Sequence, residues 1–205
     1  MTLVALSASY GAAGSRIGPA VAERLSVPFL DRAIPMAVAA ELELPHEDAL
    51  AYDEHLRAGW LERLLRSFVA ADTGAPAPLA AETFSIDEFR RATDEVILNQ
   101  AKTGAGVILG RAAAALLIDD PRVLRVRLDG PAERRVRQAM QLGGLDERAA
   151  HQALRKLDRT HAAYLKHFYN VELHDPRLFH LRVDSTAISI DGCVELIATA
   201  AESLA

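Results

Sequence analysis

Short apolar runs alternate with longer segments of helical periodicity along most of the chain. The apolar runs predict strands near residues 4–6, 27–30, 107–109, 123–128 and 180–184. Helical spacing predicts helices over residues 15–25, 33–68 with a break at Pro45, 85–102, 112–117, 132–142, 146–169 and 190–204. The run of alanine, glycine and proline over residues 70–79 predicts an exposed loop. The alternation of strands and helices predicts an α/β fold with a mainly parallel sheet.

The first strand runs into a turn of small residues that opens the first helix. Gly11 and Gly14 lie in this turn, and small side chains let a ligand approach the backbone closely. Because a helix start carries partial positive charge, the turn is a candidate phosphate cradle. The same residues would also form a tight strand-to-helix connection that binds nothing, and the turn alone does not separate the two interpretations.

Ligands of parallel sheets bind beyond the carboxyl ends of the strands, so the residues just after each strand are informative. Arg32 and Arg111 each follow a predicted strand, and guanidinium groups pair with phosphate through two hydrogen bonds. For either arginine taken alone, the alternative to phosphate binding is an ion pair on the protein surface. Asp31 would orient Arg32 or bind a substrate hydroxyl or amino group, or it would serve only as a turn residue.

The long predicted helix carries basic residues at intervals of seven, four and seven positions, which place them on one face. They are Arg148, Arg155, Arg159 and Lys166. This face is either solvated or a lid that closes over phosphates and neutralises developing charge. Asp158 would hold Arg155 in place, and Arg134 and Arg135 on the preceding helix would lie at the base of the lid.

Composition narrows the classes of function. The chain has 205 residues, half of them hydrophobic, and a formal net charge of −5. That balance argues against a protein that coats nucleic acid. The single Cys193 excludes an internal disulfide and indicates a reducing compartment, and its helical surroundings predict a buried thiol. We find no membrane-spanning run, no signal peptide and no metal-ligand spacing among the histidines, so we expect a cytoplasmic protein.

The ordered set of strand ends resembles the cytidylate kinase-like family, a branch of the P-loop nucleoside monophosphate kinases. The segments that carry the resemblance are residues 7–18, 27–32, 107–112 and 126–130, Asp158 and Arg159 with Tyr164, His167, Phe168 and Tyr169, and residues 183–186. They occur in the family's order and cover nearly the whole chain. The resemblance implies one domain over residues 1–205 with a three-layer P-loop NTPase-like fold, in which helices flank about five parallel strands.

The resemblance also implies a site and an activity. A helical monophosphate-binding insertion would occupy residues 33–103, and a helical lid residues 143–170. ATP phosphates would bind the loop residues Gly11, Ala12, Ala13, Gly14, Ser15 and Arg16. Asp31, Arg32 and Arg111 would bind the acceptor, and Arg155 and Arg159 would close from the lid. The implied activity is transfer of the ATP γ-phosphate to a nucleoside monophosphate such as CMP, with Mg²⁺.

The loop departs from the full P-loop pattern, in which lysine and then Ser or Thr follow the last glycine. Here Ser15 and Arg16 follow Gly14, so Arg16 is the candidate catalytic cation and Ser15 the candidate metal ligand. No acidic residue directly follows Arg111 to help hold the metal, which leaves Asp129 and Asp184 as substitute metal ligands.

Three functions therefore compete. The first is an ATP-dependent phosphotransferase that acts on a nucleotide or a similar small phosphorylated acceptor. The second is a catalytically degenerate nucleotide-binding sensor, which the missing lysine favours. A nicotinamide-dependent enzyme ranks last, because the glycine spacing of the dinucleotide fingerprint is missing. Trp60, Leu64 and Phe68 would give a homo-oligomer its contact if their helix is left uncovered.

Overall fold

We analysed a computed structural model, which describes residues 2–32, 86–110, 112–144 and 146–204. The predicted loop over residues 70–79, the helices over residues 33–68 and Arg111 lie outside these residues. The chain divides into two units, residues 1–34 with 94–205 and residues 35–93. Of the second unit, the structure describes only residues 86–93, which belong to a helix.

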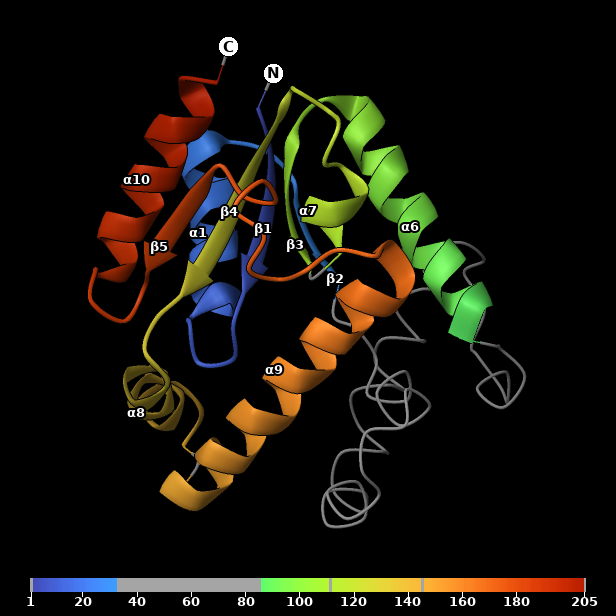
Figure 1. The fold of residues 1–205 in the computed structure, drawn as a ribbon. Helices are drawn as coiled ribbons and strands as arrows, with labels where there is room; N and C mark the ends of the chain where they lie inside the picture. Colours follow the sequence, from blue (N-terminus) through green and yellow to red (C-terminus); the bar gives the residue numbers. More distant parts are fainter. Residues whose placement is uncertain (1, 33–85, 111, 145, 205) are drawn as a thin grey trace, which may run out of the picture. The chain divides into compact units, whose positions relative to one another are not determined.

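The centre of the first unit is a parallel sheet in which the strands follow the order β2-β3-β1-β4-β5. The strands are β1 (Leu3–Ala8), β2 (Phe29–Arg32), β3 (Gly106–Gly110), β4 (Val123–Asp129) and β5 (Leu181–Asp184). Leu6 of β1 pairs with Leu109 of β3 on one side and with Val126 of β4 on the other. The carboxyl ends of these strands therefore meet at one edge of the sheet (Figure 1).

Helices connect the strands, as parallel pairing requires. They are α1 (Gly14–Leu25), α6 (Ile86–Thr103), α7 (Ala113–Leu116), α8 (Ala132–Gly143), α9 (Glu147–Tyr169) and α10 (Ile190–Glu202). The side chain of Asp146 caps α9, and that of Ser189 caps α10. Gly144, in the left-handed region, ends α8.

One face of the sheet is covered by α1 and α10. Val4 and Leu6 of β1 point to this face and pack with Ile17 and Val21 of α1 and with Ile197 of α10. The period-two alternation of β1 sends its neighbouring residues to the opposite face. Cys193 of α10 is buried in the same cluster, as the sequence predicts, and burial raises the pKa of its thiol.

The opposite face is covered by α6, α7 and α9. Leu3 of β1 and Ile108 of β3 pack there with Ile97 of α6, Ala113 of α7 and Leu165 of α9. The arrangement is a three-layer α/β fold, and it confirms the predicted parallel sheet of five strands. The helix α9 is continuous over Glu147–Tyr169, and Leu165 near its end is buried in this core cluster.

We predict that Leu165→Ala lowers the free energy of unfolding by about 2–5 kcal/mol, because the side chain is fully buried between α9 and the sheet. Leu196→Ala on α10 is the matched control. That side chain is 47% exposed, so its loss should cost less than about 0.5 kcal/mol. Equal effects of the two substitutions in urea unfolding would show that α9 does not contribute to the core.

Candidate active site at the β1–α1 loop

The loop between β1 and α1 turns sharply at two left-handed positions. Gly11 has a φ of 75° and Ala13 a φ of 54°. The N–H of Ala12 donates to the carbonyl of Ser9 at 3.1 Å, and the N–H groups of Arg16 and Ile17 donate to the carbonyl of Ala13 at 3.0 and 2.9 Å. The turn therefore brings the start of α1 directly to the carboxyl edge of the sheet.

Two carbonyl groups of the loop accept hydrogen bonds from side chains that lie outside the loop. The Tyr10 carbonyl accepts a hydrogen bond from Nη1 of Arg135 at 3.0 Å, and the Ala12 carbonyl accepts one from Oγ of Ser185 at 2.8 Å. In a planar trans peptide the C=O and N–H groups point in opposite directions. The N–H groups of Gly11 and Ala13, which share these peptides, consequently point away from Arg135 and Ser185.

The N–H groups of Ala13, Gly14 and Ser15 donate to no other residue in the described part of the chain. They are the first donors of α1, which an α-helix leaves without partners of its own. Several such donors together with the positive end of the helix form a ready site for phosphate. The structure thus gives the β1–α1 loop the backbone arrangement of a phosphate cradle.

A pocket of about 410 Å³ opens over this loop. Its lining comes from the loop, from the ends of β2 and β3 and from α8. The described lining residues are Ala8, Ser9, Tyr10, Gly11, Ala13, Gly14, Ser15, Asp31, Leu109, Gly110, Ala139, Leu142 and Gly143. The pocket is large enough for a small ligand, and its polar groups gather where the loop lies.

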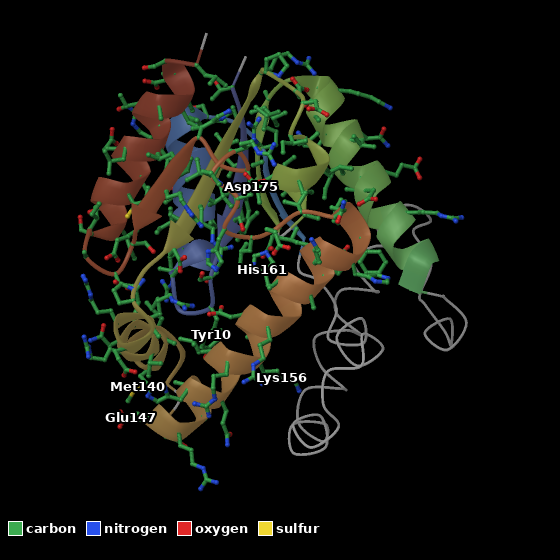
Figure 2. All side chains as sticks on the ribbon, viewed as in Figure 1. Tyr10, Met140, Glu147, Lys156, His161 and Asp175 are labelled. Carbon is green, nitrogen blue, oxygen red and sulfur yellow. The ribbon has the colours of Figure 1, made fainter. Side chains whose placement is uncertain are left out.

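A buried arginine lies beneath the loop. Arg127 of β4 is 1% exposed and donates to Oγ of Ser7 at 2.8 Å and to Oγ of Ser9 at 2.7 Å. Its Nη1 also lies 3.4 Å from Nδ1 of His161 on α9. Figure 2 shows His161 on the side of α9 toward the sheet. A buried charge needs such partners, so this network ties β1, β4 and α9 together beneath the loop.

The two aspartates considered as metal ligands are both engaged by protein groups. Asp129 accepts a hydrogen bond from Ser9 at 2.7 Å and lies 3.5 Å from Nε of Arg135. Asp184 accepts from the hydroxyl and N–H of Thr186, and the Thr186 hydroxyl is the main cause that lowers the pKa of this carboxyl. In the described ranges no group of three metal-binding side chains occurs.

Two residues that line the pocket carry oxygen atoms of the kind that magnesium prefers. Ser15 is exposed at the start of α1, and Asp31 is exposed at the end of β2; both line the pocket. Mg²⁺ is usually held by one or two protein oxygens together with substrate phosphates and water. The residues present therefore fit a magnesium ion that arrives with a nucleotide.

The other predicted site residues are arginines on α1, on α9 and at the ends of β2 and β3. Arg16 is exposed near the pocket, on the first turn of α1, and Arg155 and Arg159 are exposed on α9. The side chain of Arg32 and all of Arg111 lie outside what the structure describes. Of the three residues predicted to bind the acceptor, the structure brings Asp31 to the pocket beside the loop.

The lid-support residues have other partners than the sequence suggests. Asp158 was expected to hold Arg155, yet it forms a two-pronged ion pair with Arg135 at 2.8 and 3.2 Å. Arg134 lies 3.4 Å from Asp184 instead of supporting α9. Adjacent residues on α8 face different directions, so the helical spacing alone could not decide which arginine meets α9.

Sequence reasoning did not identify Arg127 as part of the site, and it placed Arg135 at the base of the lid without its contacts to Tyr10 and Asp158. The alternation along β4 contained a signal for the first, because Arg127 shares its strand face with the apolar Val123. A basic residue on a buried strand face needs partners, and the serines at the end of β1 supply them. For Arg135 the sequence indicated a place beside the long helix, but helical spacing did not distinguish it from Arg134 as the partner of that helix.

The parallel sheet, the phosphate-type loop and the pocket over it place the chain in the P-loop kinase-like fold class. The model of the cytidylate kinase-like family matches residues 3–187, and the chain belongs to that family. No curated protein matches the chain.

Solved structures with the same fold include three that cover almost the whole chain. An uncharacterized protein from Eubacterium ventriosum ATCC 27560 has a TM-score of 0.64 at 15% identity and covers 99% of both chains. A sugar kinase from Janibacter sp. HTCC2649 has a TM-score of 0.52 at 17% identity, with 100% of this chain and 96% of that chain covered. A gluconokinase from Sinorhizobium meliloti 1021 has a TM-score of 0.52 at 17% identity, with 99% and 95% covered.

At these identities the likeness shows the fold alone. Within the described ranges, no helix combines the length and the apolar character needed to cross a membrane.

We predict that Gly11→Ala removes phosphate binding and lowers stability. A Cβ at this position would lie 2.2 Å from the carbonyl oxygen of Arg135, and the φ of 75° is unfavourable for alanine. Gly143→Ala on α8 is the stability control, because its Cβ would meet no atom within 4 Å. Thermal unfolding and pyrophosphate titration check both; if Gly11→Ala binds pyrophosphate as the wild type does, the loop conformation is not what binds phosphate.

Proposed function

We propose that the protein transfers the γ-phosphoryl group of ATP to a small acceptor, with a cytidylate-like nucleoside monophosphate as the acceptor class. Membership of the cytidylate kinase-like family supports a phosphotransferase. The observation that carries the proposal is the loop in which the N–H groups of Ala13, Gly14 and Ser15 bond to no described residue while the carbonyls behind them are bonded. Such a loop suits the phosphates of a nucleotide.

Phosphoryl transfer asks the protein mainly for positioning and charge stabilisation. The acceptor oxygen attacks the γ-phosphorus while the bond from this phosphorus to the β–γ bridging oxygen breaks, and ADP leaves. In our proposal residues 11–16 hold the ATP phosphates. Arg155 and Arg159 approach from α9 and stabilise the charge on the transferring group. A magnesium ion, when bound at Ser15 and the phosphates, would neutralise charge on the β- and γ-oxygens.

The acceptor side of the site rests on residues at the ends of β2 and β3. Asp31 lines the pocket, and its carboxylate would accept a hydrogen bond from a hydroxyl or amino group of the acceptor. Arg32 and Arg111 follow the same strand ends in the sequence. We propose that they bind the acceptor phosphate, because guanidinium groups match phosphate oxygens in geometry and charge.

A nucleotide-binding sensor without catalysis is the second candidate. The loop has no lysine, and the carboxylates of Asp129 and Asp184 are engaged by protein groups. These features would lower catalytic power and leave nucleotide binding intact. Either function is compatible with a cytoplasmic location, which the single buried cysteine favours.

The two candidates separate in one assay. The protein is incubated with Mg-ATP and a panel of nucleoside monophosphates, and ADP formation is followed over time. We expect turnover with at least one acceptor, together with thermal stabilisation by ATP. Stabilisation by ATP without turnover on any member of the panel would overturn the kinase and favour the sensor. If ATP neither stabilises the protein nor is turned over, both candidate functions are refuted.

For the acceptor that gives turnover, we predict that Arg159→Ala lowers kcat by a factor on the order of 10³, the range seen when a charge-stabilising arginine is lost in phosphoryl transfer. The side chain is exposed, so the free energy of unfolding should change by less than about 1 kcal/mol. Arg122→Ala, before the amino end of β4, removes an exposed arginine at the opposite edge of the sheet and serves as the control. If both variants keep the wild-type kcat, Arg159 takes no part in the reaction.

A further inference from the structure

Arg135 contacts the loop and α9 through one side chain. Its Nε donates to the Gly130 carbonyl at 2.9 Å, and its Nη1 donates to the Tyr10 carbonyl at 3.0 Å. Nη1 and Nη2 also bind the two carboxylate oxygens of Asp158 at 3.2 and 2.8 Å. All the guanidinium nitrogens are thus engaged, by groups from three different parts of the chain.

Only an arginine can make this set of contacts. The planar guanidinium presents donors in fixed directions, whereas a lysine ammonium offers one centre on a flexible stem. The side chain of Arg135 is 9% exposed and that of Asp158 is 29% exposed, so the ion pair is partly shielded from water. Two-pronged pairs of this kind are among the stronger hydrogen-bonded interactions in proteins.

The main chain of Arg135 also touches the loop. Its carbonyl oxygen lies where a Cβ on Gly11 would be only 2.2 Å away. Tyr10, the preceding loop residue, packs against a buried cluster that contains Val136 of α8 and Leu154 of α9. Figure 2 shows Tyr10 in the space between the loop and these two helices. The loop is therefore held on α8 by main-chain and side-chain contacts at the same place.

These contacts set the orientation of one peptide. Because the guanidinium holds the Tyr10 carbonyl, the N–H of Gly11 in the same planar peptide points the opposite way. Gly11 lines the pocket. If the guanidinium were lost, this peptide could rotate and direct its carbonyl dipole toward a bound phosphate, which would weaken binding.

The same guanidinium fixes one turn of α9. Asp158 lies three residues after Arg155 and directly before Arg159. A displacement of this turn must either break the pair with Arg135 or move the loop with it. The placement of the two exposed arginines is thereby linked to the conformation of the loop.

We propose that Arg135 is a positioning residue that couples phosphate binding at the β1–α1 loop to the placement of the Asp158 turn of α9. The inference deepens the proposed function and rests on it, since the bound phosphate is that of the nucleotide. It assigns Arg135 no contact with the reacting atoms. Its effect passes through the Tyr10 peptide on one side and through Asp158 on the other.

The test compares Arg135→Lys and Asp158→Asn with Arg137→Lys, a change of the same type at an exposed position of α8. Binding of ATP and of inorganic tripolyphosphate is measured by calorimetry, and folding by circular dichroism and thermal unfolding. We expect Arg135→Lys and Asp158→Asn each to weaken both ligands by about tenfold or more, within the range typical of coupled sites. Arg137→Lys should bind as the wild type does.

The double variant is the sharpest part of the test. Because Arg135 and Asp158 act through one link, the combined loss in affinity should be smaller than the product of the two single losses. A purely structural role would lower the unfolding temperature and leave the dissociation constants of the folded protein unchanged. That result, or fully multiplicative losses, would overturn the inference.

Failure of the inference is distinguishable from failure of the proposed function. Wild-type protein that binds neither ATP nor tripolyphosphate would refute the proposed function. Wild-type binding that Arg135→Lys and Asp158→Asn leave intact would refute only the coupling. If Arg135→Lys fails to fold, Asp158→Asn keeps the test valid. This substitution replaces the carboxylate by an uncharged amide of nearly the same shape.

Discussion

The candidate site depends on two hydrogen bonds that side chains outside the β1–α1 loop donate to carbonyl groups of the loop. Arg135 binds the Tyr10 carbonyl and Ser185 binds the Ala12 carbonyl, so these carbonyls are held away from the pocket. Peptide planarity then directs the N–H groups of the same peptides the other way. At the start of α1 the N–H groups of Gly14 and Ser15 add to them. An arrangement of backbone donors that suits an anion follows from how the loop is supported, in a loop without lysine.

The residues that support the loop lie far from it in the sequence, and the order of the strands in the sheet brings them to it. Ser185 follows β5, Arg135 lies on α8 after β4, and Arg127 beneath the loop belongs to β4 itself. Because β4 neighbours β1 and β5 neighbours β4, the parallel order brings all three to the carboxyl end of β1. The sheet order therefore positions the site as well as the core.

Much of this fold could be predicted from the sequence. Val4 and Leu6 alternate with residues of the opposite face, Gly144 ends α8, and the strand ends fall beside one another as a parallel sheet requires. The partners of charged residues could not be predicted, because helical spacing does not say which neighbouring element a side chain meets. Asp158 of α9 thus pairs with Arg135 of α8, whereas its spacing along the helix had suggested Arg155 as the partner.

The central claim is that the loop binds phosphate through its backbone. The most direct measurement is a titration of ¹⁵N-labelled protein with a non-hydrolysable ATP analogue, in which the amide signals of the loop are followed one by one. Our account predicts downfield shifts of the Ala13, Gly14 and Ser15 amide protons, because hydrogen bonds to phosphate deshield them. Saturable binding of the analogue that leaves these three signals unmoved would contradict it.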